Sequence, residues 1–79
     1  MQDTQHFKDM LAERGIQQSW VEHAIESPDK IENHEDGTRH FIARIQERGG
    51  RWLRVVVNID ETPNKRVTAF FDRRLRNIQ

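Results

Sequence analysis

The chain has 79 residues with a formal net charge of zero, 33% of them are charged, and it contains no cysteine. This composition excludes a disulfide framework, a thiolate nucleophile and a cysteine-based zinc site. The N-terminus has no basic segment followed by an apolar run, and no stretch is long enough to cross a bilayer. We therefore expect a soluble, cytoplasmic protein without signal peptide or membrane anchor.

The zero net charge hides an uneven distribution. Residues 1–38 carry three basic and nine acidic side chains, a net charge of −6, whereas residues 39–79 carry ten basic and four acidic ones, a net charge of +6. Such a separation can steer an anionic partner to one side of the molecule. Head-to-tail contacts between copies, or plain solvation, explain it equally well.

A first helix is predicted over residues 4–14. Asp3 or Thr4 supplies the N-cap, and Gly15 supplies the C-terminal stop. Its apolar side chains recur at positions i, i+3 and i+4, which indicates one buried stripe. These side chains are Phe7, Met10 and Leu11.

A second helix is predicted over residues 19–27. Ser19 and Glu22 form an S-x-x-E pattern, the capping box in which each side chain satisfies a free N–H at the helix start. Pro28 ends this helix, because the residue before a proline is displaced from the α region. The two helices together form an αα-hairpin.

The rest of the chain has the composition of antiparallel strands. The densest β-branched run, RWLRVVVNI, is predicted to be the central strand. Asp36-Gly37 is expected to form a tight two-residue turn, which sets Ile31 opposite Ile42; burial of Ile31 beneath the helices would instead require a loop one residue longer or shorter. The basic tail 73–79 is either a short helical turn or frayed. The predicted strands span residues 30–35, 38–47, 51–59 and 66–72.

The pairing of the two long strands follows from matching their apolar faces. A three-residue Arg48–Gly50 loop sets Ile45 opposite Leu53, so that the apolar side chains of both strands face the same way. The same register places Arg44 opposite Arg54. Like charges in direct opposition destabilise a sheet unless an anion or acid joins them, so we expect a negative group beside this pair. A phosphate, Asp72 or an acidic side chain of another protomer would serve.

These elements predict a single α+β domain over residues 1–79. Its order is ααββββ, with two N-terminal helices packed on one face of a four-stranded antiparallel sheet. Two helices cover only one face, so the second face is expected to be partly open. We assign Val67, Ala69 and Phe71 to the core face and Arg66, Thr68, Phe70 and Asp72 to the open face.

The open face supplies the candidate site. A metal-independent ribonuclease needs a base, cations for the phosphate and an acid, while arginines beside aromatic rings suit single-stranded RNA. The apolar side chains of this face have a second explanation: they are buried under the C-terminal tail, or they form a homodimer interface through Trp52, Val56 and Phe70. The candidate catalytic residues are His40, Arg44, Arg54 and Asp72, and the remaining binding-face residues are Trp52, Asn58, Arg66 and Phe70.

Other chemistries receive no support from the sequence. The four histidines lack the i, i+4 spacing of a helical zinc pair, so no metal site is predicted. No serine lies in a G-x-S-x-G context, and Gly49-Gly50 joins two strands and does not open a phosphate-binding helix. We expect no cofactor.

The order of several short motifs resembles a known family. The pattern H-x7-R-G-I begins at His6, and AIESPD, DG, LRVVV and VTAFF follow it. Together they resemble the small bacterial domain-of-unknown-function family numbered 4258, over nearly the whole chain. That family in turn resembles the RelE/ParE toxin fold, in which two helices precede an antiparallel sheet.

The resemblance implies a toxin-like domain whose relatives include ribonucleases, gyrase poisons and inactive members. The polar positions that match the family are His6, Arg14, Arg54 and Thr68. Met10 stands where the family often has a second arginine, and the chain has no tyrosine, which some toxin ribonucleases use. Two hypotheses stay open: RNA binding or cleavage at the open face, and a non-catalytic module that forms a homodimer or binds an antitoxin-like partner.

Overall fold

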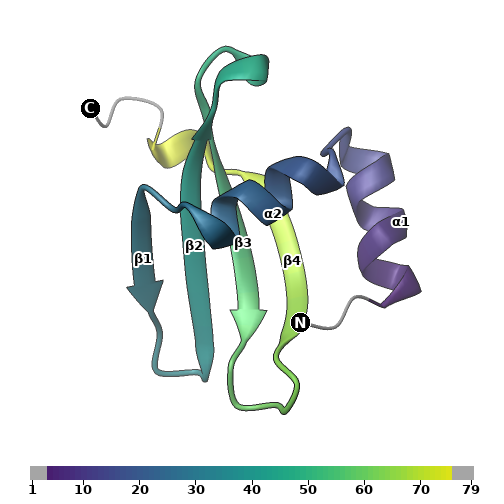
Figure 1. The fold of residues 1–79 in the computed structure, drawn as a ribbon, viewed down its shortest axis with the longest axis vertical. Helices are drawn as coiled ribbons and strands as arrows, with labels where there is room; N and C mark the ends of the chain where they lie inside the picture. Colours follow the sequence, from purple (N-terminus) through teal and green to yellow (C-terminus); the bar gives the residue numbers. More distant parts are fainter. Residues whose placement is uncertain (1–3, 76–79) are drawn as a thin grey trace.

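The computed structural model describes residues 4–75, and its architecture agrees with the predicted ααββββ order (Figure 1). Four antiparallel strands form one sheet in the order β1-β2-β3-β4. Each strand therefore lies next to its neighbour in sequence. The elements are α1 (Gln5–Arg14), α2 (Gln18–Glu26), β1 (Lys30–Asn33), β2 (Thr38–Ile45), the 3₁₀ turn η1 (Gln46–Arg48), β3 (Arg51–Asn58), β4 (Lys65–Phe71) and the 3₁₀ turn η2 (Arg73–Leu75).

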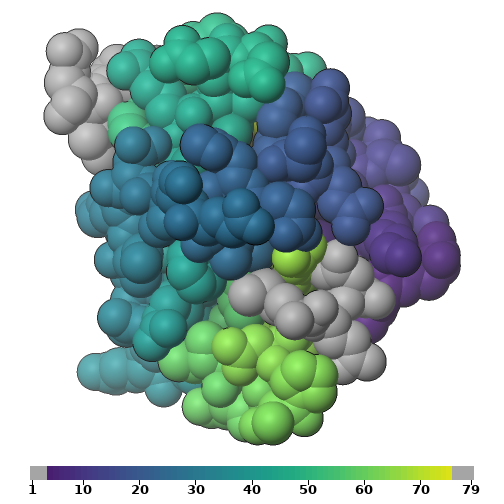
Figure 2. Space-filling view, viewed as in Figure 1, coloured from purple at the N-terminus to yellow at the C-terminus, as the bar shows by residue number. Residues whose placement is uncertain are grey.

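Both helices lie on the same side of the sheet. Figure 1 shows α2 lying across the sheet, while α1 stands beyond β4 at the opposite end from β1. In the space-filling view from the same side, the blue surface of α2 covers the middle of the molecule (Figure 2). The core between the layers combines the apolar stripes of both helices with alternate residues of β2, β3 and β4. It contains Phe7, Met10, Leu11, Ile16, Trp20, Val21, Ala24, Ala43, Ile45, Leu53, Val55, Val57 and Ala69.

The boundaries of α1 follow the prediction. The Thr4 hydroxyl accepts a hydrogen bond from the Phe7 backbone N–H at 3.1 Å, so it satisfies a donor that the helix itself leaves unpaired. Gly15 adopts φ 64°, the left-handed conformation that glycine tolerates at a helix end. The alternative cap, Asp3, lies outside the described residues.

The predicted capping box of α2 is wrong. The helix begins one residue earlier, with Gln17 as the N-cap residue and no side-chain hydrogen bond to the first turn. Ser19 Oγ instead lies 3.4 Å from Gln17 Oε1, and Glu22 forms an ion pair with Arg66 of β4. A tertiary partner has thus taken the carboxylate that the local pattern assigned to the helix end.

The register of β2 and β3 differs from the prediction by two residues. Ile45 lies opposite Arg51, and Arg44 lies opposite Trp52 rather than Arg54. The connection contains five residues because η1 is followed by two glycines with positive φ. Since the shift is even, every side chain keeps its predicted face. The predicted like-charge pair is therefore absent from the strand pairing.

The first hairpin is also longer than predicted. Asn33 pairs with Arg39, and the His34 N–H donates to Thr38 O, which leaves three residues in the turn instead of Asp36-Gly37 alone. Ile31 consequently lies opposite Phe41, on the helix-facing side of the sheet. It nevertheless remains 48% exposed at the sheet edge.

A β-bulge changes the assignment of β4. The pairing shifts between Val56 and Val57, so that Arg66 lies opposite Val57 while Thr68 lies opposite Val56. Val67 is the extra residue and is 46% exposed, so its predicted place in the core is wrong. Arg66, predicted on the open face, is instead buried on the helix side, where Arg66 Nη1 lies 2.6 Å from Glu22 Oε1.

The second face of the sheet is less open than predicted. Ile42, Val56 and Arg54 are buried there, and Leu75 of η2 is buried as well. The predicted helical turn in the tail is present as η2, while residues 76–79 lie outside the description. In the described range 4–75, no helix is long and apolar enough to span a bilayer.

Alanine substitutions at the two helix starts should have different effects on stability. Thr4→Ala removes a cap hydrogen bond and should lower the free energy of unfolding by about 1 kcal/mol. Ser19→Ala removes an exposed side chain that caps nothing and should stay within about 0.5 kcal/mol of the parent. Urea unfolding followed by tryptophan fluorescence measures both values, and equal losses would contradict the assignment of the caps.

Candidate functional site

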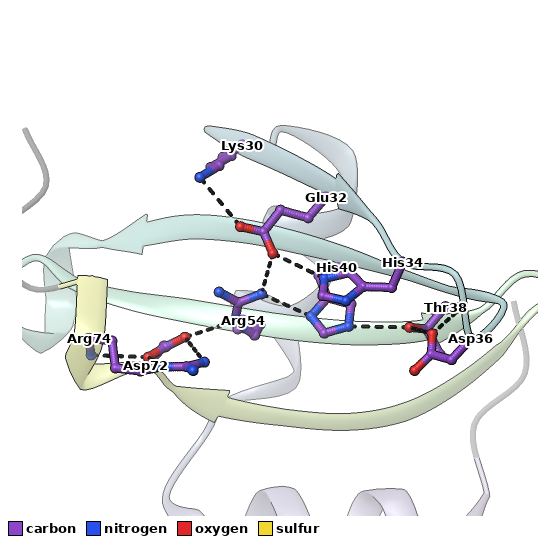
Figure 3. A network of polar contacts seen from close by, with 9 residues as sticks. All are labelled: Lys30, Glu32, His34, Asp36, Thr38, His40, Arg54, Asp72 and Arg74. Atoms are coloured by element: carbon purple, nitrogen blue, oxygen red, sulfur yellow. Dashed lines mark hydrogen bonds and ion pairs between the residues drawn. The ribbon is translucent and has the colours of Figure 1, made fainter.

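A buried arginine lies at the centre of the second sheet face. Arg54 occupies the middle of β3, and its side chain is only 7% exposed. Its Nε donates to Asp72 Oδ2 at 2.9 Å, and its Nη1 donates to Glu32 Oε1 at 2.8 Å and to His40 Nδ1 at 2.9 Å (Figure 3). These bonds join β1, β2 and β3 to the residue that follows β4.

Asp72 is saturated by its neighbours. Its Oδ1 accepts from the backbone N and Nε of Arg74, both at 3.0 Å. Its Oδ2 accepts from Arg74 Nη2 at 3.0 Å and from Arg54 Nε. The Arg74 hydrogen bonds, followed by those of Arg54, lower the pKa of Asp72 from 3.8 to about 2. This carboxylate therefore remains ionised and fully occupied at neutral pH.

His40 is held in one neutral tautomer. An arginine can only donate, so the His40 Nδ1 beside Arg54 is the acceptor, and Nε2 carries the hydrogen that points to Thr38 Oγ1 at 3.3 Å. The Thr38 hydroxyl in turn donates to Asp36. The His34 ring stacks on His40 with centroids 3.7 Å apart. Burial, then the charges of His34 and Arg54, lower the pKa of His40 below 6.5.

Glu32 balances the other side of the guanidinium. It accepts from Arg54 and also contacts His34 Nε2 at 3.1 Å and Lys30 Nζ at 3.4 Å. The hydrogen bond from Arg54, then the one from His34, lowers the pKa of Glu32 from 4.5 to about 2. With Asp72 and Glu32 both ionised, the charge of Arg54 is offset within the molecule. The negative group expected beside the arginines is thus supplied by the protein itself.

Three side chains of this network are of the types that bind metal ions. Ligand atoms of Glu32, His34 and His40 all lie within 4.8 Å of one another, and a carboxylate with two imidazoles suits Zn²⁺. However, Arg54 already donates to Glu32 Oε1 and to His40 Nδ1. A divalent ion would have to break these bonds and lie beside a permanent positive charge. The arrangement therefore fits a guanidinium better than a metal ion.

A cleft of ≈ 490 Å³ lies at the end of the sheet where β3 begins and β4 ends. Its lining has four arginines, three aromatic rings and a single carboxylate, that of Asp72. Arginines 48, 51 and 73 are exposed, and the two rings from the second sheet face are half-buried. The lining consists of Arg14, Ile16, Arg48, Arg51, Trp52, Phe70, Phe71, Asp72 and Arg73.

Two arginines contact aromatic rings of the cleft: Arg44, which does not line it, and Arg48, which does. The Arg44 guanidinium lies 5.7 Å from the centroid of Trp52, and its Nε donates to Gly50 O at 2.9 Å. A Cβ atom at Gly50 would lie 2.9 Å from that Nε and would displace the Arg44 side chain, while the φ of 77° at this position itself favours glycine. Arg48 lies 5.4 Å from the centroid of Phe71. These cation–π contacts orient the rings that face the cleft.

The end of α1 closes the cleft on its other side. Arg14 Nη1 donates to Ala69 O at 2.8 Å and to Thr68 Oγ1 at 3.2 Å, and the Thr68 hydroxyl also lies 3.2 Å from Met10 Sδ. Two of the family-matched polar residues, Arg14 and Thr68, are therefore in contact. His6, the third, is exposed one helical turn before Met10.

The structure separates the predicted site residues into three groups. Three of the four candidate catalytic residues, His40, Arg54 and Asp72, share one network. The fourth, Arg44, is paired with Trp52 on the neighbouring strand and contacts its ring. Trp52 and Phe70 line the cleft. Two binding-face residues lie elsewhere: Asn58 accepts from the Asp60 backbone N–H at 2.9 Å, and Arg66 faces α2. Val56 is 8% exposed, which removes it from the surface of the predicted dimer interface.

Sequence reasoning missed several residues of the site, among them Glu32 and three arginines of the cleft. Glu32 belongs to the predicted strand 30–35, but its position opposite His40, which places it beside Arg54, depends on a strand register that the sequence left undetermined. Arg48, Arg51 and Arg73 lie in a turn, at a strand end and in the tail, where their side-chain directions do not follow from periodicity. The positive charge of residues 39–79 was the available signal for this basic surface.

The fold and the site together define a small two-layer α+β domain with a basic, aromatic-lined cleft. Residues 4–71 match a domain of unknown function, DUF4258. Because this match covers most of the chain, the protein belongs to the DUF4258 family, and the family predicted from the sequence motifs is confirmed. No curated protein and no solved structure matches the chain significantly.

Replacement of Arg54 should reveal its structural role. Arg54→Met keeps much of the side-chain volume but leaves Glu32 and the buried Asp72 without their shared cation, so we expect a loss of about 3–5 kcal/mol in the free energy of unfolding. Arg44→Met is the matched control, because Arg44 is an exposed arginine on the neighbouring strand, and it should cost about 1 kcal/mol or less. Equal losses in urea unfolding would contradict a central role for Arg54.

Acidification should destabilise the protein in two stages. The native pKa of His40 lies below 6.5, so below pH 6.5 the unfolded chain binds more protons and the free energy of unfolding begins to fall. Glu32 and Asp72 have native pKa values of about 2 instead of 4.5 and 3.8. As the pH drops from 4.5 to about 2, the unfolded chain therefore binds protons before the native protein does, and the free energy of unfolding falls further.

Urea unfolding between pH 2 and 8 measures this dependence. Each shifted carboxyl should contribute a slope of about 1 kcal/mol per pH unit within its range. Glu32→Gln is the matched variant: it should be less stable at pH 7 and should lose less stability between about pH 4.5 and 2. A variant curve that runs parallel to the parent curve would show that Glu32 does not cause the acid sensitivity.

Proposed function

We propose that this protein binds single-stranded RNA in the cleft between the start of β3, the end of β4 and the end of α1. The observation that carries the proposal is the composition of the lining, in which four arginines and three aromatic rings accompany one carboxylate. Because Asp72 accepts hydrogen bonds from Arg54 and Arg74, it adds no uncompensated negative charge to the cleft. The cleft thus offers a net positive, partly apolar surface.

The chemistry of the lining favours a single strand over a duplex. Arginine contacts the phosphate backbone, and exposed ring faces stack on unpaired bases. Trp52 and Phe70 are half-buried, so part of each side chain remains available to a ligand. The paired bases of a duplex would not present their faces to these rings. RNA also fits the strongly basic character of residues 39–79.

The network around Arg54 supports binding rather than strand cleavage. Both ring nitrogens of His40 have partners, and all the hydrogen-bonding capacity of Asp72 is used by arginines. A general base needs a free lone pair within reach of the proton that it removes. Arg54, His40 and Asp72 are therefore best explained as the support of the cleft.

This proposal agrees with a RelE/ParE-like, toxin-related role in the bacterial cytoplasm. The family resembles that fold, in which two helices precede an antiparallel sheet, and the ααββββ order of this chain is compatible with the resemblance. Relatives with that fold include ribonucleases and gyrase poisons, so fold alone does not fix the target. An antitoxin-like protein that masks the cleft would be the corresponding partner. The fold likeness supports the kind of role, and the cleft supports the kind of ligand.

Fluorescence polarisation with a labelled oligouridylate of about 12 nucleotides tests the proposal. The parent protein should bind at low salt, and its affinity should fall steeply as salt is added, because phosphate contacts release counterions. The double variant Arg51→Ala/Arg73→Ala should bind about tenfold or more weakly and show a salt slope smaller by about 1.4.

Lys8→Ala serves as the control, since Lys8 is exposed on α1 and does not line the cleft. It should leave the affinity unchanged, and a duplex of the same length should compete poorly. Absence of binding by the parent protein at low salt would refute the proposal, as would equal losses in the control and in the double variant.

A further inference from the structure

The two edges of the sheet are protected to different degrees. At β4, α1 stands beside the outer strand, and Arg14 donates to Ala69 O, a backbone acceptor of that edge. The bulge at Val67 interrupts the same edge. Bulges and covering helices are two ways in which proteins prevent unwanted strand pairing. Within residues 4–75, neither device is present at β1.

The edge of β1 presents backbone groups that can pair with another strand. The His34 N–H donates to Thr38 O, and in an antiparallel ladder the inward-directed residues alternate with outward-directed ones. Glu32 therefore directs its backbone N–H and C=O toward β2, whereas Ile31 and Asn33 direct theirs outward. Figure 1 shows β1 as the outermost strand, on the side of the sheet away from α1.

The side chains of β1 add an apolar group to this edge. Ile31 is 48% exposed although it lies on the helix-facing side, opposite the partly buried Phe41. A half-exposed isoleucine at the centre of an unpaired strand favours association with another strand, because burial of its side chain adds to the backbone hydrogen bonds.

The sequence of β1 is complementary to itself. When two copies pair antiparallel with Ile31 opposite Ile31, Lys30 of each copy lies opposite Glu32 of the other. The outward-directed backbone groups of the two Ile31 residues then form two hydrogen bonds. Opposite charges across a strand pair are favourable. Lys30 already lies 3.4 Å from Glu32 within one chain, so each carboxylate would lie between two lysines.

We propose that two copies of this protein associate through their β1 strands into a two-fold symmetric dimer with a continuous eight-stranded sheet. A two-fold axis perpendicular to the sheet keeps the helices of both copies on one side. The second sheet faces, with both Arg54 networks, lie together on the other side. This surface is distinct from the cleft, so dimerisation does not depend on the proposed RNA binding.

The dimer is expected to be weak. Strands of four residues bury less area than the roughly 1,200 Å² of a stable interface, so a dissociation constant of about 10 μM to 1 mM is expected. Sedimentation equilibrium across this concentration range measures it. The mean mass should rise from the monomer toward the dimer, independently of added RNA.

Ile31→Lys is the decisive variant, because it places two lysines opposite each other and removes the apolar pair. It should weaken association at least tenfold, and its circular dichroism should remain that of the parent, since the side chain is half-exposed. Val67→Lys is the matched control: Val67 is exposed to a similar extent on the opposite edge, and its replacement should leave association unchanged.

Three outcomes would overturn the inference: a monomer at all concentrations, association that is unaffected by Ile31→Lys, or association that is abolished equally by Val67→Lys. Failure of RNA binding alone would leave the dimer intact. Conversely, a strictly monomeric protein that binds RNA would contradict the dimer and retain the proposed function.

Discussion

The requirement to balance one buried cation determines much of this structure. A guanidinium is a charged group that cannot be buried alone, so the burial of Arg54 in β3 is stable only with partners of opposite charge and good geometry. Those partners come from β1, β2 and the residue after β4. One guanidinium therefore contacts a side chain from every neighbouring part of the sheet. The short β1, with little buried apolar area of its own, is held partly by Glu32.

The same constraint shapes the cleft without contributing a free charge to it. Asp72 is fixed by Arg54 on one side and by Arg74 on the other, and η2 begins immediately after it. The position of Arg73 in the cleft lining follows from this anchor. Arg44 acts similarly at the other wall, where it holds Trp52 through its contact with Gly50. The interior network and the exposed arginines are thus parts of one arrangement.

Periodicity predicted which side of the sheet most residues face, because alternation is a local property of extended backbone. It did not predict which residues lie opposite one another, since this depends on turn lengths: Gln46 to Gly50 form a five-residue connection where three residues were expected. Local patterns also failed where distant partners compete for a side chain, as with Glu22 and Arg66. Glu32 could be recognised as a partner of Arg54 only after its pairing with His40 was known.

The bulge at Val67 reverses the alternation of side-chain directions along β4. Residues after it alternate in step with β3, and residues before it alternate out of step, which is how Arg66 reaches α2 while Ala69 remains in the core. The identity of the exposed side chain at position 67 matters little, whereas the presence of a residue there matters greatly. The chain should accordingly accept many replacements at this position but no deletion, because the number of residues in this strand, more than their identity at position 67, sets which side chains face the helices.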